Sequence, residues 1–469
     1  MSICESGIDG KIEAQKIMMD VTSAHPLIKL GQSLPWRELF ELVLEDLKKT
    51  HKNSWWLGRK LKVRMHLGVY FLQQIFNKTD REIEYDVKDN AAYQIFCGRE
   101  IVQNWHAPDH TKIEKFRSRL SPETQKQLAN HMAAHAVKLG FADPSHIDID
   151  STVQEANMTY PADSVLLKKL GVISKKTAAY LNKAVDQYIK EPITVNIKKI
   201  ASSARDYFFL KKSSTKEMKD KKLMALLDSV CEETYSVIAT TIALTDEAIK
   251  RIPWNIKRSI HQLRDIATQY LKDVRTFIVE GFMVSTKRIS FHLKEVACFT
   301  KGKLGKKYQF GRAFQLTRTG GNFFVVTKCE TVQMPDKTSL PAIINEHEKI
   351  FNNVKINSVS TDKGYYSKKN EKLLSKKNVV DIAIQRPHNI KKSRIKSLSK
   401  EREEELVNRR SGIEPLIGHI KQGGQLGRSR MQSDRGIECS GYTAVMGFNM
   451  RQLIRCQKPH PIRKKSLEN

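Results

Sequence analysis

The residue whose neighbours most suggest chemistry is Glu414, in the stretch KEREEELVNRRSGIEPLIGHIK over residues 400–421. Arg410 precedes it by four residues and Lys421 follows it by seven. At about 100° per residue, a continuous helix would place these three side chains on one face. A carboxylate between two fixed cations can hold a divalent metal beside a phosphate whose oxygens the cations bind. A surface helix with ion pairs is the alternative for this stretch alone, and Pro415 would kink either helix.

Two more acidic positions lie near the ends of predicted strands. In SHIDIDSTVQEA the period changes to two, so Asp148 and Asp150 point to the same face. Two carboxylates on one face are costly unless that face meets solvent or a cation. A second predicted strand, VKINSVSTD, ends at Asp362, and Gly364 permits a tight turn behind it. Strand ends of an open α/β sheet meet at one edge, so Asp150, Asp362 and Glu414 could together hold two divalent ions about 4 Å apart for phosphoryl transfer.

The elements that position these acids follow a recognisable order. Apolar residues at helical spacing predict helices over residues 35–140 and a helical block over 164–285. Gly320–Gly321 between two β-rich runs predicts a hairpin, and VVDIAI, residues 379–384, predicts a buried parallel strand. The predicted fold class is therefore α/β. It consists of a mixed sheet with a helical insertion after its first strand, preceded by an all-helical amino-terminal domain.

Helix-capping signals predict where several of the helices begin. Thr79–Glu82 and Thr111–Glu114 both fit a capping box. Ser121–Pro122 fits an N-cap followed by proline in the first turn. Asp163 is predicted to cap the first helix of the insertion, and Gly423–Gly424 is interpreted as a helix stop.

The net charge of +30 is the strongest compositional signal. Residues 363–400 carry twelve Lys and Arg against two acids, whereas residues 1–46 carry eight acids and four bases. A chain this basic is expected to bind a polyanion, and nucleic acid is the usual one. Association with the ribosome or with anionic lipid would fit the charge alone.

Other residue patterns exclude several classes of protein. Seven singly placed cysteines predict neither a disulfide framework nor a zinc site and indicate a reducing cytoplasm. No apolar run approaches membrane-spanning length, the amino end shows no secretory signal, and no phosphate-loop motif indicates ATP use. His131 and His135 have a metal-capable spacing but lack the glutamate of a metalloprotease motif, so they are interpreted as structural or exposed.

Taken together, three motifs resemble the DDE transposases of bacterial insertion sequences, whose catalytic domain has a ribonuclease-H-like fold. They are IDSTVQEANMTYPADS around Asp150, STDKGYYS around Asp362 and RRSGIEPLIGHIKQGGQLGRSR around Glu414. KGKLGKKYQFG resembles the family's second strand, and WRELFELVLEDL begins a stretch similar to its amino-terminal domain. The resemblance implies that the three acids are the catalytic and metal-binding triad for two Mg²⁺ or Mn²⁺ ions.

The same resemblance assigns roles to the basic neighbours of the triad. In the family signature, three residues separate an arginine from the glutamate that follows it, and six residues separate that glutamate from a lysine. Arg410, Glu414 and Lys421 have this spacing. Its tyrosine would fall at Val407, a departure that leaves open whether a DNA hairpin intermediate is formed. Asp150 is preferred to Asp148 because a Ser-Thr-Val run follows it. The residues predicted to bind DNA are Arg410, Lys421, Lys363, Arg428 and Arg430.

The resemblance implies that a magnesium-bound water hydrolyses a phosphodiester at the end of the insertion sequence. The freed 3′-hydroxyl then attacks a phosphodiester of the target DNA. The implied partner is double-stranded DNA, both of the insertion-sequence ends and of the target, and the protein is expected to bind it as a homodimer. Neither a membrane nor a nucleotide cofactor is expected. The expected location is the bacterial cytoplasm, associated with the nucleoid. A DNA-binding relic that no longer cuts and an RNA-binding structural protein are the alternatives. Strand-end acids argue against the latter, since they repel a phosphate backbone unless metal intervenes.

These observations predict four parts of the chain. The predicted parts are a helical amino-terminal DNA-binding and dimerisation domain (1–145), a ribonuclease-H-like catalytic domain (146–163 with 286–458), a helical insertion (164–285) and a basic tail (459–469).

Overall fold

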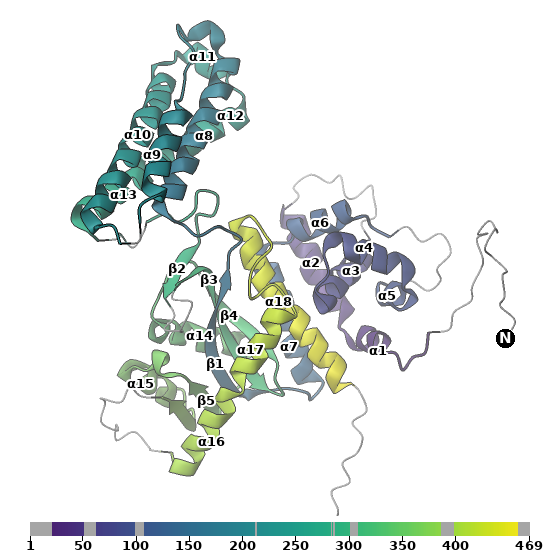
Figure 1. The fold of residues 1–469 in the computed structure, drawn as a ribbon. Helices are drawn as coiled ribbons and strands as arrows, with labels where there is room; N and C mark the ends of the chain where they lie inside the picture. The colour runs from purple at the N-terminus through teal and green to yellow at the C-terminus, as the bar shows by residue number, and fades with distance from the viewer. Residues whose placement is uncertain are drawn as a thin grey trace, which may run out of the picture. The chain divides into compact units, whose positions relative to one another are not determined.

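The chain folds into two compact units, shown as a ribbon in Figure 1. The first comprises Met1–Glu155, Arg312–Met431 and Arg435–Asn469, and the second Ala156–Gly311 with Gln432–Asp434. The computed structural model describes residues 21–50, 62–98, 107–211, 213–282, 284, 287–300, 308–385 and 398–457. The predicted basic tail, 459–469, and residues 386–397 of the predicted basic stretch lie outside these ranges.

A mixed sheet forms the centre of the first unit. Its strands are β1 (Asp143–Glu155), β3 (Tyr308–Gly320, whose first residues belong to the second unit), β4 (Phe324–Glu330), β5 (Ser358–Thr361) and β6 (Asp381–Ile384). The order is β4-β3-β1-β5-β6, with β1, β5 and β6 parallel and the β3–β4 hairpin antiparallel. The predicted hairpin and the predicted parallel strands are confirmed, and with them the α/β class.

Helices cover this sheet through two apolar clusters. Those that follow the hairpin are α14 (Asp336–Ile350), η4 (Lys363–Tyr365), α15 (Lys368–Lys376), α16 (Lys400–Ser411), α17 (Ile413–Gln422) and α18 (Asp434–Cys456). Ile147 and Ile149 of β1 pack with α14 and η4 in one cluster. Phe314 of β3 packs with α17 and α18 in the other. These clusters fix the strands and helices from which the candidate site projects.

Amino-terminal helices complete the first unit. They are α1 (Pro26–Ser33), α2 (Trp36–Thr50), α3 (Val63–Phe76), α4 (Asp80–Asp89), α5 (Ala91–Phe96), α6 (His110–Arg119) and α7 (Pro122–Lys138). Their buried side chains, such as Leu67 and Leu128, form one cluster with Phe323 beside β4 and Met446 of α18. The amino-terminal helices therefore share a hydrophobic core with part of the sheet region.

Two of the predicted helix starts in this region are confirmed and one is wrong. The capping box at Thr79–Glu82 is present in full, and Ser121 caps α7 before a first-turn proline. The box predicted at Thr111–Glu114 is not formed, because Asp109 caps α6 by accepting the Lys112 N–H at 2.9 Å. Thr111 lies inside the first turn and donates to the same carboxylate. An aspartate two residues earlier thus supplies a stronger acceptor than the threonine hydroxyl.

The second unit is built mainly of helices, as predicted for residues 164–285. Its elements are α8 (Asp163–Ala184), η2 (Asp186–Tyr188), α9 (Ile197–Phe208), α10 (Lys216–Ala243), α11 (Asp246–Arg251), α12 (Trp254–Ile266), η3 (Ala267–Leu271), α13 (Lys272–Glu280) and β2 (Ala297–Thr300). β2 pairs antiparallel with the first residues of β3. A core of leucine and isoleucine side chains holds the helices together.

Asp163 does not cap α8, contrary to the prediction. Ala162 occupies the N-cap position without a side-chain hydrogen bond, and Asp163 is the first helical residue. The Asp163 carboxylate instead binds Lys287 Nζ at 2.6 Å and the Tyr270 hydroxyl at 3.0 Å. These two partners, 107 or more positions away in the chain, draw the carboxylate from its own backbone. In neither unit does a described helix have the length and apolarity needed to cross a membrane.

Candidate active site

Asp150 and Asp362 lie at adjacent positions on neighbouring strands. β1 and β5 are parallel with Ile149 opposite Thr361, and the two aspartates directly follow this pair. Asp362 ends its strand by accepting the Gly364 N–H at 2.9 Å, which forms the predicted tight turn. The two acids that the sequence placed at one sheet edge are therefore brought together.

Glu414 joins this edge through Arg410. Arg410 Nη2 lies 3.4 Å from Asp150 Oδ2 and 3.8 Å from Glu414 Oε1. The Glu414 side chain is 68% exposed, whereas that of Arg410 is only 13% exposed. Arg410 therefore links the strand acid to the helix acid and leaves Glu414 open to solvent.

The helix that carries these residues is broken at Gly412 instead of kinked at Pro415 as predicted. α16 ends at Ser411 and α17 begins at Ile413. Arg318 approaches the break closely, since a Cβ on Gly412 would lie 3.1 Å from its Nη1. Pro415 then falls in the first turn of α17, where a missing N–H costs no helical hydrogen bond.

The other predicted cations lie close to these carboxylates in the chain, on exposed or half-buried positions. Lys363 is exposed directly after Asp362, and Lys421 is half-buried in the last turn of α17. Arg428 and Arg430 are exposed on the segment that follows. That segment runs beside the end of β1, because Glu155 and Arg428 form a parallel bridge.

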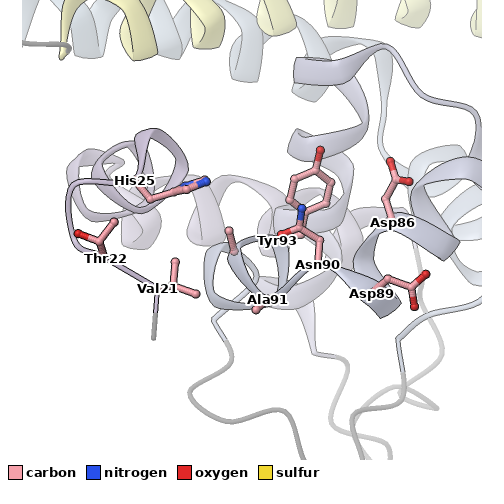
Figure 2. Close-up of a pocket in the computed structure, with 9 residues that line it drawn as sticks. Val21, Thr22, His25, Asp86, Asp89, Asn90, Ala91 and Tyr93 are labelled. Atoms are coloured by element: carbon pink, nitrogen blue, oxygen red, sulfur yellow. Dashed lines mark hydrogen bonds between the residues drawn. The ribbon is translucent and has the colours of Figure 1, made fainter. Parts of the chain in front are cut away.

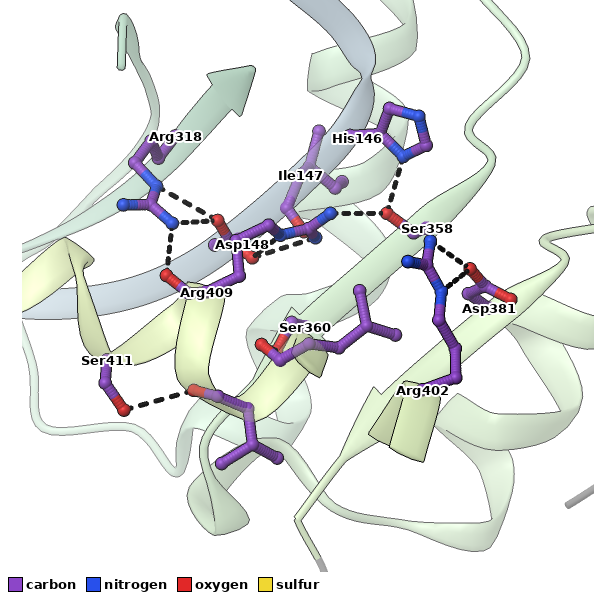
Figure 3. A network of polar contacts seen from close by, with 12 residues as sticks. His146, Ile147, Asp148, Arg318, Ser358, Ser360, Asp381, Arg402, Arg409 and Ser411 are labelled. Atoms are coloured by element: carbon purple, nitrogen blue, oxygen red, sulfur yellow. Dashed lines mark hydrogen bonds and ion pairs between the residues drawn. The ribbon is translucent and has the colours of Figure 1, made fainter. Parts of the chain in front are cut away.

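Asp148, two residues before Asp150, has a different environment (Figure 3). It is 2% exposed, and its Oδ2 accepts from Arg318 Nε at 3.0 Å while its Oδ1 accepts from Arg409 Nε at 2.9 Å. Arg409 also donates to the Ser358 hydroxyl at 2.9 Å, which ties α16 to β5. Both Asp148 oxygens are thus held by fixed guanidinium groups, which supports the preference for Asp150.

Neither arginine of this network was predicted from the sequence. Arg318 is a charged residue in the otherwise apolar and neutral run FQLTRTG of β3, and such a residue needs a buried partner. That irregularity was the available signal. Arg409 stands beside Arg410 in an exposed-looking helix, and nothing in its local sequence marks it out.

A fourth acid near the site, Asp336, was not predicted from the sequence either. It is the first residue of α14, and its Oδ1 accepts from Gln315 Nε2 at 3.1 Å. Burial raises the pKa of Asp336, and the nearby Asp362 carboxylate raises it further. Its acidic surroundings therefore set it apart from Asp148, which two arginines hold.

The donors at this edge suit a hard divalent cation. Asp150, Asp362 and Glu414 offer carboxylate oxygens, the ligands that Mg²⁺ prefers, and none of the three is enclosed by fixed arginines as Asp148 is. Among the described residues, no three His, Cys, Asp or Glu side chains are gathered closely enough to hold a metal ion. The edge thus presents the right chemistry with its acids adjacent but not drawn into one cluster.

A cavity elsewhere in the first unit does not contribute to this site. It has a volume of about 710 Å³ and is lined by residues before α1 and around the junction of α4 and α5 (Figure 2). His25, Asp86 and Asp89 are among its described lining residues, which include none of the predicted site residues. The candidate site is therefore the open strand edge and not this cavity.

Comparison with known proteins assigns the family. Residues 15–119 match the family model "Transposase domain (DUF772)", and residues 275–450 match "Transposase DDE domain", a span that contains Asp362 and Glu414. An uncharacterized protein, ORF8 in the nfe locus of Rhizobium meliloti, is 28% identical over 147 residues, which are 30% of this chain and 68% of that protein. No solved structure matches the chain. The mixed sheet and amino-terminal helices agree with a ribonuclease-H-like catalytic fold, and the chain belongs to the DDE transposases of insertion sequences.

Proposed function

We propose that this chain hydrolyses a phosphodiester at insertion-sequence ends and transfers the freed strand to target DNA, with Asp150, Asp362 and Glu414 as its catalytic, metal-binding carboxylates. The observation that supports this proposal is the register of β1 and β5, which puts Asp150 and Asp362 side by side. Glu414 is connected to them through Arg410. Two Mg²⁺ or Mn²⁺ ions are the cofactor that such a set of oxygens fits.

When bound, divalent ions at such a site lower the pKa of water and offset negative charge on the phosphate under attack. The chain's own contribution is to fix the groups around that phosphate. Arg409 anchors α16 on β1 through Asp148, so the next residue, Arg410, is held beside Asp150. A guanidinium held there can bind phosphate oxygens in a fixed orientation.

The proposed partner is double-stranded DNA of the element ends and the target, bound by a homodimer. Lys363, Lys421, Arg428 and Arg430 flank the site in the chain and are proposed, with Arg410, to contact the DNA backbone. Residues 1–145 are proposed as a DNA-binding and dimerisation domain. Association with the nucleoid would follow from such DNA binding.

The test replaces each acid by its amide in the full chain: Asp150→Asn, Asp362→Asn and Glu414→Gln. Each variant should lose more than about 100-fold of its Mg²⁺-dependent cleavage of end DNA, because loss of a ligand should cost at least as much as loss of an outer-sphere partner. Binding to the same DNA in a gel-shift assay should stay near normal. The matched control is Glu348→Gln, an acid of α14 that pairs with Lys377 at 2.6 Å.

Two results would contradict the proposal in different ways. Wild-type cleavage rates in any one of the three variants would remove that residue from the triad. A native chain that binds end DNA but cuts it with neither Mg²⁺ nor Mn²⁺ would instead establish the inactive DNA-binding relic.

A further inference from the structure

We propose that Asp336 is a positioning residue of the same site, which places a fourth negative charge beside Asp362 and strengthens the binding of a divalent cation there. This inference rests on the proposed function, because it assumes that Asp362 binds metal. It concerns a residue outside the three motifs on which the family resemblance depends.

Asp336 and Asp362 face one another across Gly364. A Cβ built on Gly364 would lie 3.1 Å from Asp362 Oδ1 and 3.2 Å from Asp336 Oδ2. One oxygen of each carboxylate therefore borders the space that the missing side chain leaves open. A methyl group there would be tighter than an ordinary van der Waals contact, so one or both oxygens would have to move by a few tenths of an ångström.

Buried partners hold Asp336 in this orientation. Gln315 donates to Asp336 Oδ1 at 3.1 Å, and its own Oε1 accepts from the Tyr365 hydroxyl at 2.5 Å. Gln315 and Tyr365 are both fully buried. The Ser151 side chain, next to Asp150 in the chain, lowers the pKa of Asp336 and so offsets part of its rise. Asp336 is thus held through Gln315 by Tyr365, which lies three residues after Asp362.

The charged groups close to Asp336 have its own sign. The ones that act on it are the carboxylates of Asp362 and Glu330, and both raise its pKa beyond the effect of burial. In the described part of the chain it forms no ion pair with Lys or Arg, in contrast to Asp148 with its two arginines. Glu330 is itself paired with Lys328 at 3.1 Å, so the like-charge repulsion that matters is that between Asp336 and Asp362. Like charges held together are unfavourable, and such arrangements cluster at binding and catalytic sites.

A purely structural role is the competing explanation. Asp336 is the first residue of α14, where a negative charge favours the helix dipole. That position accounts for an acid at residue 336 but not for the buried hydrogen bonds that turn it toward Asp362. The two explanations predict opposite effects of neutralisation on stability.

The experiment compares Asp336→Asn with native protein in the full chain without DNA. Mn²⁺ binding is followed by electron paramagnetic resonance of the free ion, and stability by thermal unfolding in a chelator. Asp336→Asn should raise the Kd for Mn²⁺ by about 10-fold or more, the range for residues that support metal ligands. Its metal-free melting temperature should stay the same or rise, since a repulsion is removed. Asp336→Glu should recover part of the affinity, and the control Glu348→Gln should leave it unchanged.

A second variant, Gly364→Ala, adds one methyl group between the two carboxylates without changing any charge. It should also weaken Mn²⁺ binding, and it decides the question if Asp336→Asn does not fold. Native Mn²⁺ affinity in the folded variants, with or without a loss of stability, would overturn the inference and leave the triad intact. Native affinity in Asp362→Asn as well would show that the proposed function itself is wrong.

Discussion

Two aspartates on one face of β1 have opposite surroundings. Asp148 is buried, and both of its oxygens accept hydrogen bonds from arginine side chains. Asp150 lies next to Asp362, its side chain is 15% exposed, and Arg410 Nη2 is 3.4 Å from its Oδ2. A shift of two residues along the strand therefore separates an acid held by two arginines from one that has another aspartate beside it.

This difference indicates how the strand divides its roles. An acid enclosed by two fixed guanidinium groups has no lone pair left for a metal, so it serves to hold α16 and β3 against β1. Asp150 accepts the Ser151 N–H at 2.8 Å and lies 3.4 Å from Arg410, so fewer cations hold it than hold Asp148. Asp148 helps to position Arg410 beside Asp150, because Asp148 binds Arg409, the neighbour of Arg410 on α16.

The largest expected effect is on stability when Asp148 is neutralised. Asp148→Asn leaves the buried Arg318 and the half-buried Arg409 without their carboxylate, which should lower the free energy of unfolding by about 3–5 kcal/mol. Asp150→Asn should lower it by less, since Asp150 has one arginine contact, of 3.4 Å, in place of two shorter ones. Urea unfolding followed by circular dichroism measures both values.

The contrast fails if the two amide variants are equally stable. Such a result would mean that the arginines find other partners when Asp148 is changed. Asp228→Asn, which breaks the exposed pair with Arg275 at 2.9 Å, is the control for losing an ion pair without burial.

The next effect is the pH dependence of the free energy of unfolding. It tests whether the buried histidine His347 controls unfolding at low pH. His347 of α14 is fully buried, and its Nε2–H donates to the Pro144 carbonyl at 2.8 Å. Burial lowers the pKa of His347 to about 4, from about 6.5 in an unfolded chain. The unfolded chain therefore binds more protons between these values, so the free energy of unfolding should fall by up to about 3 kcal/mol as pH drops from 6.5 to 4.

His347→Gln keeps an N–H donor for Pro144 but cannot be protonated in this range. Its stability should therefore vary less with pH than that of native protein, as measured by urea midpoints at pH 4.5, 5.5 and 6.5. An unchanged pH slope would show that carboxylates, and not His347, control acid unfolding. His261→Gln, an exposed histidine of α12, is the control.

The positions of Asp150 and Asp362 on neighbouring strands could be predicted from the sequence because the signals for both strands are local. The period of two in SHIDIDSTVQEA and the strand ending at Asp362 are short-range patterns, and β1 and β5 follow them. The close approach of Arg318 to Gly412 could not be predicted from local patterns, because the two residues are distant in the chain. The role of Asp148 was missed for the same reason, since Arg318 and Arg409 lie 170 and 261 positions away.

Helix α18 shows a second limit of sequence analysis. Its residues are buried on nearly every side, so its apolar positions show no period of 3.6. Asn449, which is fully buried in this helix, accepts the Phe324 N–H at 2.9 Å and so fixes the first residue of β4. A helix that is buried all round can be located only when its surroundings are known.

The smallest expected effect distinguishes the neighbouring arginines of α16. Arg410→Gln removes contacts of 3.4 Å and 3.8 Å, one of them to an exposed glutamate, so it should lower the free energy of unfolding only slightly. Arg409→Gln removes a bond to buried Asp148 and should cost clearly more. If Arg410 contacts a phosphate, its variant should also reduce the salt dependence of DNA binding by about one unit of slope. Equal stability losses in the two variants, with an unchanged salt slope for Arg410→Gln, would show that both arginines only hold the fold and that the edge beside Asp150 is not the path of the DNA backbone.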